Sequence, residues 1–182
     1  MPQNGDVISL GTLKVNGTLY AMPSNPVNGG DCVNYNGTAI SIENTVSGKA
    51  LRWIYAEIDG KKLLICDRCL VVNCTWNNLN SAGLIMGKNI TIDGQPYKVR
   101  SLTGGVNAND KNNEWSKIIE LNQLGIGNSN SIWHWQNMYT WCQETYSENS
   151  VYRALRGYSS AANWNNNNAT NNNTNIGWRP AL

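Results

Sequence analysis

The C-terminal 32 residues, 151–182, read VYRALRGYSSAANWNNNNATNNNTNIGWRPAL. Val151–Arg156 and Ile176–Leu182 are largely apolar segments that carry arginines, and both predict β-strands. Between them, nine of the thirteen residues of Asn163–Asn175 are asparagine. That composition is also typical of a disordered low-complexity loop, but Trp164 would be costly to leave in water. Because loops held between strands often carry binding sites, we predict that Tyr158–Asn175 is an ordered, ligand-facing loop.

Two helices are predicted upstream of this segment. From Asn113 onward, apolar residues three and four positions apart predict a helix that ends near Gly125. Apolar residues from Ile132 to Cys142 show a similar spacing and predict an amphipathic helix over Ser131–Glu144, with Ser131 as its N-cap.

Two Asp-Gly pairs indicate β-hairpins. A type I′ turn needs a positive φ at both central residues, so Asp-Gly between two apolar runs is a strong hairpin signal. The predicted hairpins join Leu51–Ile58 to Lys61–Val72 through Asp59-Gly60, and Lys88–Ile92 to Pro96–Leu102 through Asp93-Gly94.

The N-terminal part of the chain also predicts short strands, at Val7–Val15 and Thr18–Met22, followed by a loop over Pro23–Thr38. Strands without long helices in one half, and strands with two helices in the other, predict an α+β chain. We therefore expect a strand-rich region over residues 1–82 and a second domain, with two helices and a small antiparallel sheet, over residues 83–182.

The composition favours recognition over catalysis. The chain has 182 residues, with 14 Lys and Arg against 12 Asp and Glu, and a net charge of +2, which argues against a nucleic-acid partner. Charged residues are 14% of the chain, while asparagine occurs 30 times and Trp and Tyr eight times each, without any Phe. Trp and Tyr with short amide side chains are also typical of antibody loops.

Localisation signals point to synthesis in a reducing cytoplasm. The N-terminus lacks the basic start and apolar run of a signal peptide, and no stretch is as long and apolar as a membrane span. Five cysteines are an odd number, so a secreted disulfide framework is not expected.

The C-terminal motifs resemble a known fold family. The hairpin KNITIDGQPYKVRSL, the helix opening NEW, the WCQE segment, RALRGYSSAANW and the terminal IGWRPAL occur in this order from about Gly87 to Leu182. This order is similar to the C-type-lectin-like fold of formylglycine-generating-enzyme-type domains and of the variable proteins of diversity-generating retroelements, which include phage and bacterial display proteins. Arg156–Ser159 and Gly177–Pro180 stand at the positions of the family's RGGSW-like and GFRP-like strands, although Tyr158 and Trp178 depart from those motifs.

The resemblance implies a non-enzymatic binding protein, such as a phage or prophage protein that recognises a receptor through the Asn-rich loop. The variable positions of retroelement proteins are often Asn, as in this tract. The implied partner is a protein or glycan on a host surface, with no nucleic acid and no membrane insertion, and the implied location is the virion. A homotrimer would suit a fibre tip. The predicted ligand-binding residues are Arg156, Tyr158, Ser160, Asn163, Trp164, Asn165, Asn167, Asn171 and Asn173.

Metal and catalytic chemistry are the alternatives. Cys66, Cys69 and Cys74 have a C-x2-C-x4-C spacing that could hold zinc, with Cys32 or His134 as the fourth ligand. On a strand, however, Cys66 and Cys69 would face opposite sides, so we expect buried thiols and no metal.

His134 and Cys142 could form a nucleophile pair, but eight residues along a helix separate them by about 12 Å. No cysteine follows Cys142, so the activity of the formylglycine-generating relatives is not expected. The predicted loop has no carboxylate for a calcium site. We expect no catalytic residue and no cofactor.

Arginines flank the tract at Arg153, Arg156 and Arg179. They could line a site for an anion or hold the fold through ion pairs and carbonyl groups, which we favour for Arg179. A different class of function also fits the compact chain: a small phage-encoded inhibitor that binds a host defence protein or its nucleotide signal.

Overall fold

The computed structural model describes residues 1–182 and is mostly β, with 41% strand and 11% helix. The predicted α+β class is therefore wrong. The helical segments are short: η1 (Val27–Gly29), α1 (Trp76–Ser81), η2 (Ser116–Glu120) and α2 (Asn130–Trp133). No helix is long and apolar enough to span a membrane.

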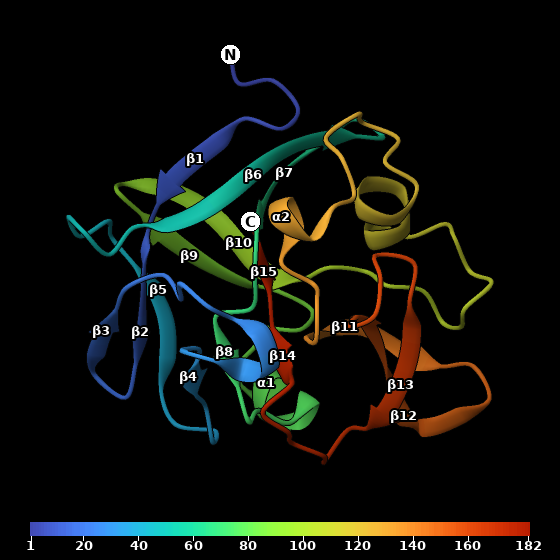
Figure 1. Cartoon of the computed structure of the whole chain (residues 1–182). Coiled ribbons are helices and arrows are strands. Elements are labelled where there is room, and N and C mark those ends of the chain that lie inside the picture. The colour runs from blue at the N-terminus through green and yellow to red at the C-terminus, as the bar shows by residue number, and fades with distance from the viewer.

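Two six-stranded sheets and one three-stranded sheet form the molecule (Figure 1). The first sheet has the order β1 (Val7–Leu10), β6 (Leu51–Ile58), β7 (Lys61–Cys66), β15 (Pro180–Ala181), β10 (Gln95–Ser101) and β9 (Lys88–Ile92). The second has the order β13 (Trp164–Asn168), β12 (Asn149–Gly157), β11 (Tyr139–Tyr146), β14 (Ile176–Trp178), β8 (Val71–Val72) and β4 (Val33–Asn34). The third has the order β3 (Thr18–Tyr20), β2 (Thr12–Val15) and β5 (Ile40–Glu43).

Strands from both sides of residue 82 occur in both large sheets. Pro180–Ala181 pairs with β7 on one side and β10 on the other, and Ile176–Trp178 lies between β11 and β8. The C-terminal segment thus joins the two sheets at the centre of the molecule, as its position in Figure 1 shows. The expected boundary between 1–82 and 83–182 does not separate one sheet from the other.

Both predicted hairpins form, but the second arm of the first ends at Cys66, and Val71–Val72 forms β8 in the other large sheet. Asp59 and Gly60 have φ values of 50° and 72°, and Asp93 and Gly94 have φ values of 51° and 79°, as a type I′ turn requires. The strand predicted at Val151–Arg156 is also confirmed, within the longer β12.

The predicted helix over Ser131–Glu144 is wrong. Only α2 is helical, because His134 and Asn137 take left-handed φ values of 45° and 54° that stop the helix, and Tyr139–Tyr146 forms β11. Three consecutive residues of this strand, from Thr140 on, are buried. A strand buried on both faces does not alternate between apolar and polar residues, so its pattern resembled that of a helix.

The helix expected from Asn113 is partly present. A helical turn leads into η2, which ends at Glu120, before the predicted end at Gly125, and Asn122 then takes a positive φ of 50°. Its buried residues Ile118 and Ile119 pack in a cluster with Trp115 and Trp133.

Candidate functional site

The Asn-rich tract begins as a strand. Trp164–Asn168 forms β13, the edge strand of the second sheet, and pairs antiparallel with β12, with Asn165 opposite Leu155 and Asn167 opposite Arg153. The expectation that all of Tyr158–Asn175 is a loop is therefore corrected. Since side chains alternate between the faces of a strand, the register places Trp164 and Asn165 on opposite faces.

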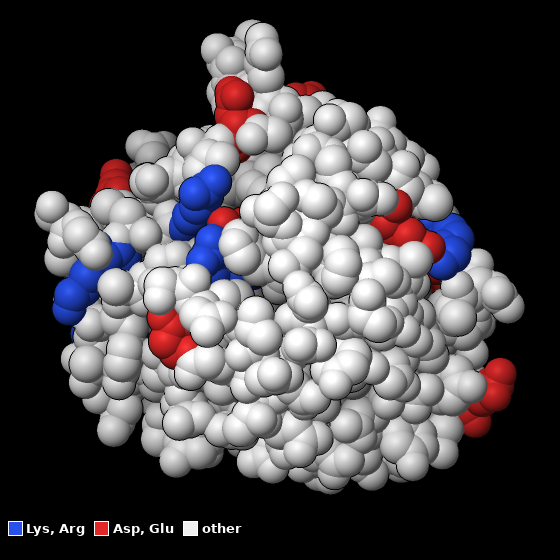
Figure 2. All heavy atoms as spheres, viewed as in Figure 1, with Lys and Arg blue, Asp and Glu red and all other residues white.

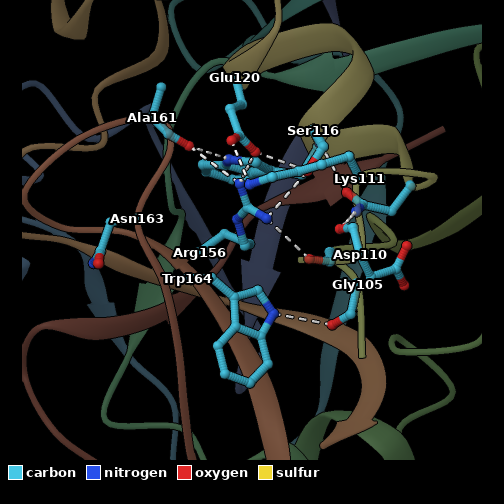
Figure 3. Close-up of polar contacts among 12 residues, drawn as sticks. Gly105, Asp110, Lys111, Ser116, Glu120, Arg156, Ala161, Asn163 and Trp164 are labelled. Atoms are coloured by element: carbon cyan, nitrogen blue, oxygen red, sulfur yellow. Dashed lines mark hydrogen bonds and ion pairs between the residues drawn. The ribbon is translucent and has the colours of Figure 1, made fainter. Parts of the chain in front are cut away.

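Arg156 lies on the face towards η2 and is fully buried. Its Nη2 donates to the Glu120 carboxylate at 2.6 Å, and its Nη1 donates to the Gly104 carbonyl at 3.1 Å and to Ser116 Oγ at 3.2 Å (Figure 3). The guanidinium group also lies over the Trp115 ring. A group enclosed in this way holds the fold together, so the predicted binding role of Arg156 is wrong.

Glu120 is the counter-ion of this interior network. Lys111 Nζ contacts its Oε1 at 2.5 Å, and Ser116 Oγ donates to its Oε2 at 2.8 Å. Burial raises the pKa of Glu120, but the hydrogen bonds from Lys111, Arg156 and Ser116 outweigh burial and leave the pKa below its usual value. The carboxylate therefore stays ionised beside Arg156.

Trp164 lies on the same face as Arg156 and is half-buried. Its Nε1 donates to the Gly105 carbonyl at 3.0 Å (Figure 3). Its ring centroid lies 5.3 Å from that of Tyr146. Asn163 is fixed as well, because its Nδ2 donates to the Gly157 carbonyl at 2.6 Å. Both side chains anchor β13 to its neighbours, and Trp164 has no second polar atom to offer a ligand.

On the other face of the sheet, asparagines of β13 and of the loop after it lie with two tyrosines from β11 and from the residue after β12. The Tyr158 and Tyr139 rings stack with centroids 4.7 Å apart and planes 8° apart, and Asn165 Nδ2 donates to the Tyr139 hydroxyl at 2.9 Å. Further along, Asn171 Nδ2 donates to Asn167 Oδ1 at 2.6 Å. We call these five residues the amide face. Four of them are among the predicted binding residues.

The asparagines of the amide face also cover the free edge of the sheet. Asn165 Oδ1 accepts a hydrogen bond from the Asn166 backbone N–H, and Asn167 Oδ1 accepts one from the Asn168 N–H, both at 2.8 Å. Free donors on an edge strand invite pairing with another strand. These two side chains occupy two of the edge donors and so disfavour strand addition.

The loop after β13 is held against the start of α1. The Asn77 N–H donates to the Ala169 carbonyl at 3.1 Å, and the Asn73 N–H donates to the Asn173 carbonyl at 3.2 Å. Asn173 is exposed at the surface of this pinned loop. Ser160 lies apart, in the turn between β12 and β13, where its carbonyl accepts a hydrogen bond from the Asn163 N–H.

The surface around this loop has few charges. Figure 2 shows that the lower part of the visible face, over β13, β14 and the loop between them, carries no Lys, Arg, Asp or Glu. After Glu148 the chain contains only three charged residues, and two of these, Arg156 and Arg179, are fully buried. Arg179 donates to the backbone carbonyls of Asp67 and Trp133, which confirms its structural role.

The cysteines lie inside the protein as free thiols. Burial raises the pKa of each thiol, including those of Cys66, Cys69 and Cys74, which opposes formation of the thiolate needed for metal binding or nucleophilic attack. No three His, Cys, Asp or Glu side chains gather as a metal site would require. Cys69 lies beyond the end of β7 at Cys66, outside the strand arm in which the sequence placed it.

His134 faces Asp67, with Nδ1 4.0 Å from the Asp67 carboxylate. Burial, and then the nearby Arg68 charge, lower the pKa of His134, so the imidazole is neutral at pH 7. Cys142 has different neighbours, since its thiol donates to the Thr140 carbonyl. This arrangement does not assemble a Cys–His pair.

Sequence reasoning missed Tyr139 because it placed this residue on a helix. The stacking of Tyr139 on Tyr158 depends on which face of β11 Tyr139 occupies and on the positive φ of 80° at Tyr158. No sequence pattern signals either of these.

No family model, no curated protein and no solved structure matches this chain.

Proposed function

We propose that this chain is a non-catalytic recognition module that binds a glycan on a host surface through the amide face. The observation that carries the proposal is the fixed row of carboxamides and stacked tyrosines on an uncharged edge of the second sheet. A carboxamide has two donor hydrogens, of which Asn165 keeps one free and Asn167 both, and such donors suit the hydroxyl groups of sugars.

A sugar fits this surface better than a protein partner does. Protein interfaces concentrate their binding energy in buried aromatic and apolar anchors. The exposed large apolar residues of the chain lie elsewhere, apart from Val151 near the end of β13, and the tyrosines are already packed on each other. A flat tyrosine pair with amides beside it offers a stacking face and hydrogen bonds to one sugar ring.

The amide face is also organised before a ligand arrives. Asn165 is held by Tyr139, Asn167 by Asn171, and the following loop by α1. Side chains that are already ordered lose less entropy on binding, which favours affinity.

The test is a glycan array probed with the wild-type chain, the double variant Asn165→Ala/Asn167→Ala and the control Asn89→Ala. Asn89 is exposed on β9, in the other large sheet. We expect the wild type and the control to bind the same glycans, and the double variant to bind them about tenfold more weakly or worse.

Equal binding by the double variant would contradict the amide face as the site. A wild-type chain that binds host cells equally well before and after enzymatic removal of their glycans would show that the partner is a protein and overturn the proposal.

A further inference from the structure

A hollow of about 380 Å³ lies beside the C-terminal end of β13. It is lined by Asn77, Ser150, Val151, Arg153, Asn168, Ala169 and Thr170. Arg153 is the only charged residue among them, and it stands opposite Asn167 in the pairing of β12 with β13, so the hollow adjoins the amide face.

The Arg153 side chain is held in one orientation. Its guanidinium carbon lies 4.4 Å from the centroid of the Trp76 ring, and its Nη1 donates to the carbonyls of Ser150 and Tyr152 at 2.7 and 3.0 Å. Stacking on an indole and two backbone hydrogen bonds fix the plane of the group.

Arg153 has no acidic partner, and part of its hydrogen-bonding capacity is unused. None of the ion pairs of the structure involves Arg153, its Nη2 makes no hydrogen bond within the chain, and its Nε is buried without a partner. The nearest carboxylate in sequence, Glu148, accepts a hydrogen bond from the Tyr146 hydroxyl instead. Arg52, Arg68, Arg100 and Arg156, in contrast, all pair with a carboxylate.

We infer that this hollow binds the carboxylate of an acidic sugar, a uronic or sialic acid, within the glycan that lies on the amide face. The inference rests on the proposed function for the rest of the ligand. A planar carboxylate matches the donor pattern of a guanidinium group and forms a charge-assisted bond with it. The exposed side chains of Asn77, Ser150 and Thr170 surround the same hollow and can bond the neighbouring hydroxyls.

The first experiment follows backbone amide signals by NMR while sodium glucuronate or, in a parallel titration, glucose is added to the full chain. The variants are Arg153→Gln, which removes the charge, and Lys62→Gln, which removes one exposed charge from β7 in the other large sheet. We expect glucuronate to shift the signals of Asn168–Thr170 in the wild type and in Lys62→Gln. We expect about tenfold weaker binding in Arg153→Gln.

Arg153→Lys separates charge from shape. It keeps the positive charge but lacks the planar fork, so we expect binding between that of the wild type and that of Arg153→Gln. Circular dichroism of each variant checks that the fold is retained. Equal shifts by glucose and glucuronate, or undiminished glucuronate binding by folded Arg153→Gln, would overturn the inference.

The glycan array distinguishes this inference from the proposed function. If neutral glycans bind through Asn165 and Asn167 and Arg153→Gln changes nothing, the amide face stands and the acidic subsite fails. If glucuronate binds at Arg153 while no glycan on the array is retained, the hollow stands and the proposed function fails.

Discussion

Strand β12 presents two arginines to opposite sides of the second sheet, Arg156 towards η2 and Arg153 towards α1. Arg156 is fully buried and paired with Glu120, whereas Arg153 is half-buried, stacked on Trp76 and without a carboxylate. The two faces of β13 differ in exposure, since Trp164 is half-buried and bonded to the Gly105 carbonyl while Asn165 is exposed and bonded to the Tyr139 hydroxyl at the surface. An arginine that is enclosed with a carboxylate maintains the fold, and one that lines a hollow with an unused Nη2 is available to a ligand.

The largest difference between the two sides is expected for the arginines. Arg156→Met leaves Glu120 buried with one partner fewer, and we expect the free energy of unfolding to fall by about 3–5 kcal/mol. Arg153→Met removes a stacking interaction without leaving any carboxylate behind, and we expect a loss of about 1 kcal/mol or less. Denaturant unfolding followed by tryptophan fluorescence measures both. Similar losses for the two variants would contradict the distinction.

Trp164 tests whether the inner face of β13 is structural. Trp164→Ala removes the packing on Tyr146 and the hydrogen bond to Gly105, and we expect a loss of about 2 kcal/mol in the free energy of unfolding. The same measurement on Trp164→Phe, which keeps an aromatic ring, should show a smaller loss. An unchanged stability together with lost glycan binding would instead place Trp164 in the binding site.

Acid should selectively weaken the ion-pair network around Glu120, on the side of β13 that carries Trp164. The pKa of Glu120 lies below its usual value of 4.5 in the folded chain, so its stabilising effect is fully present above about pH 4.5 and is lost as the pH falls through the folded-state pKa. We expect the stability of the wild type to decline below pH 4.5 more steeply than that of Glu120→Gln. Parallel declines in thermal unfolding between pH 6 and pH 3 would rule out this assignment.

The asparagines of the amide face should contribute least to the stability of the fold. We expect Asn165→Ala/Asn167→Ala to lower the free energy of unfolding by about 1 kcal/mol or less, because water can replace the lost amide contacts. The exposed edge of β13 should, however, now self-associate at high concentration. Light scattering of the double variant against Asn89→Ala measures this, and a strictly monomeric double variant would contradict the edge-covering role.

The sequence predicts structure correctly where neighbouring residues determine the backbone conformation, and incorrectly where residues distant in sequence determine it. Asp59-Gly60 and Asp93-Gly94 identified two turns because few residue pairs accept two successive positive φ values. The segment Tyr139–Tyr146 was misassigned because burial on both faces removes the alternation that marks a strand. Four residues of the amide face were selected from composition, yet Arg156, selected with them, lies in the interior.

The residue order alone specified the hairpins, the strand of Val151–Arg156, and a C-terminal segment rich in amides and aromatic rings and poor in charge. These are properties of neighbouring residues, and local backbone preferences express them directly. The long-range pairing of the strands determined which arginine met a carboxylate and which did not. Glu120 and Arg156 are 36 residues apart, and no local pattern could show that they meet in the interior while Arg153, three residues away, faces a hollow.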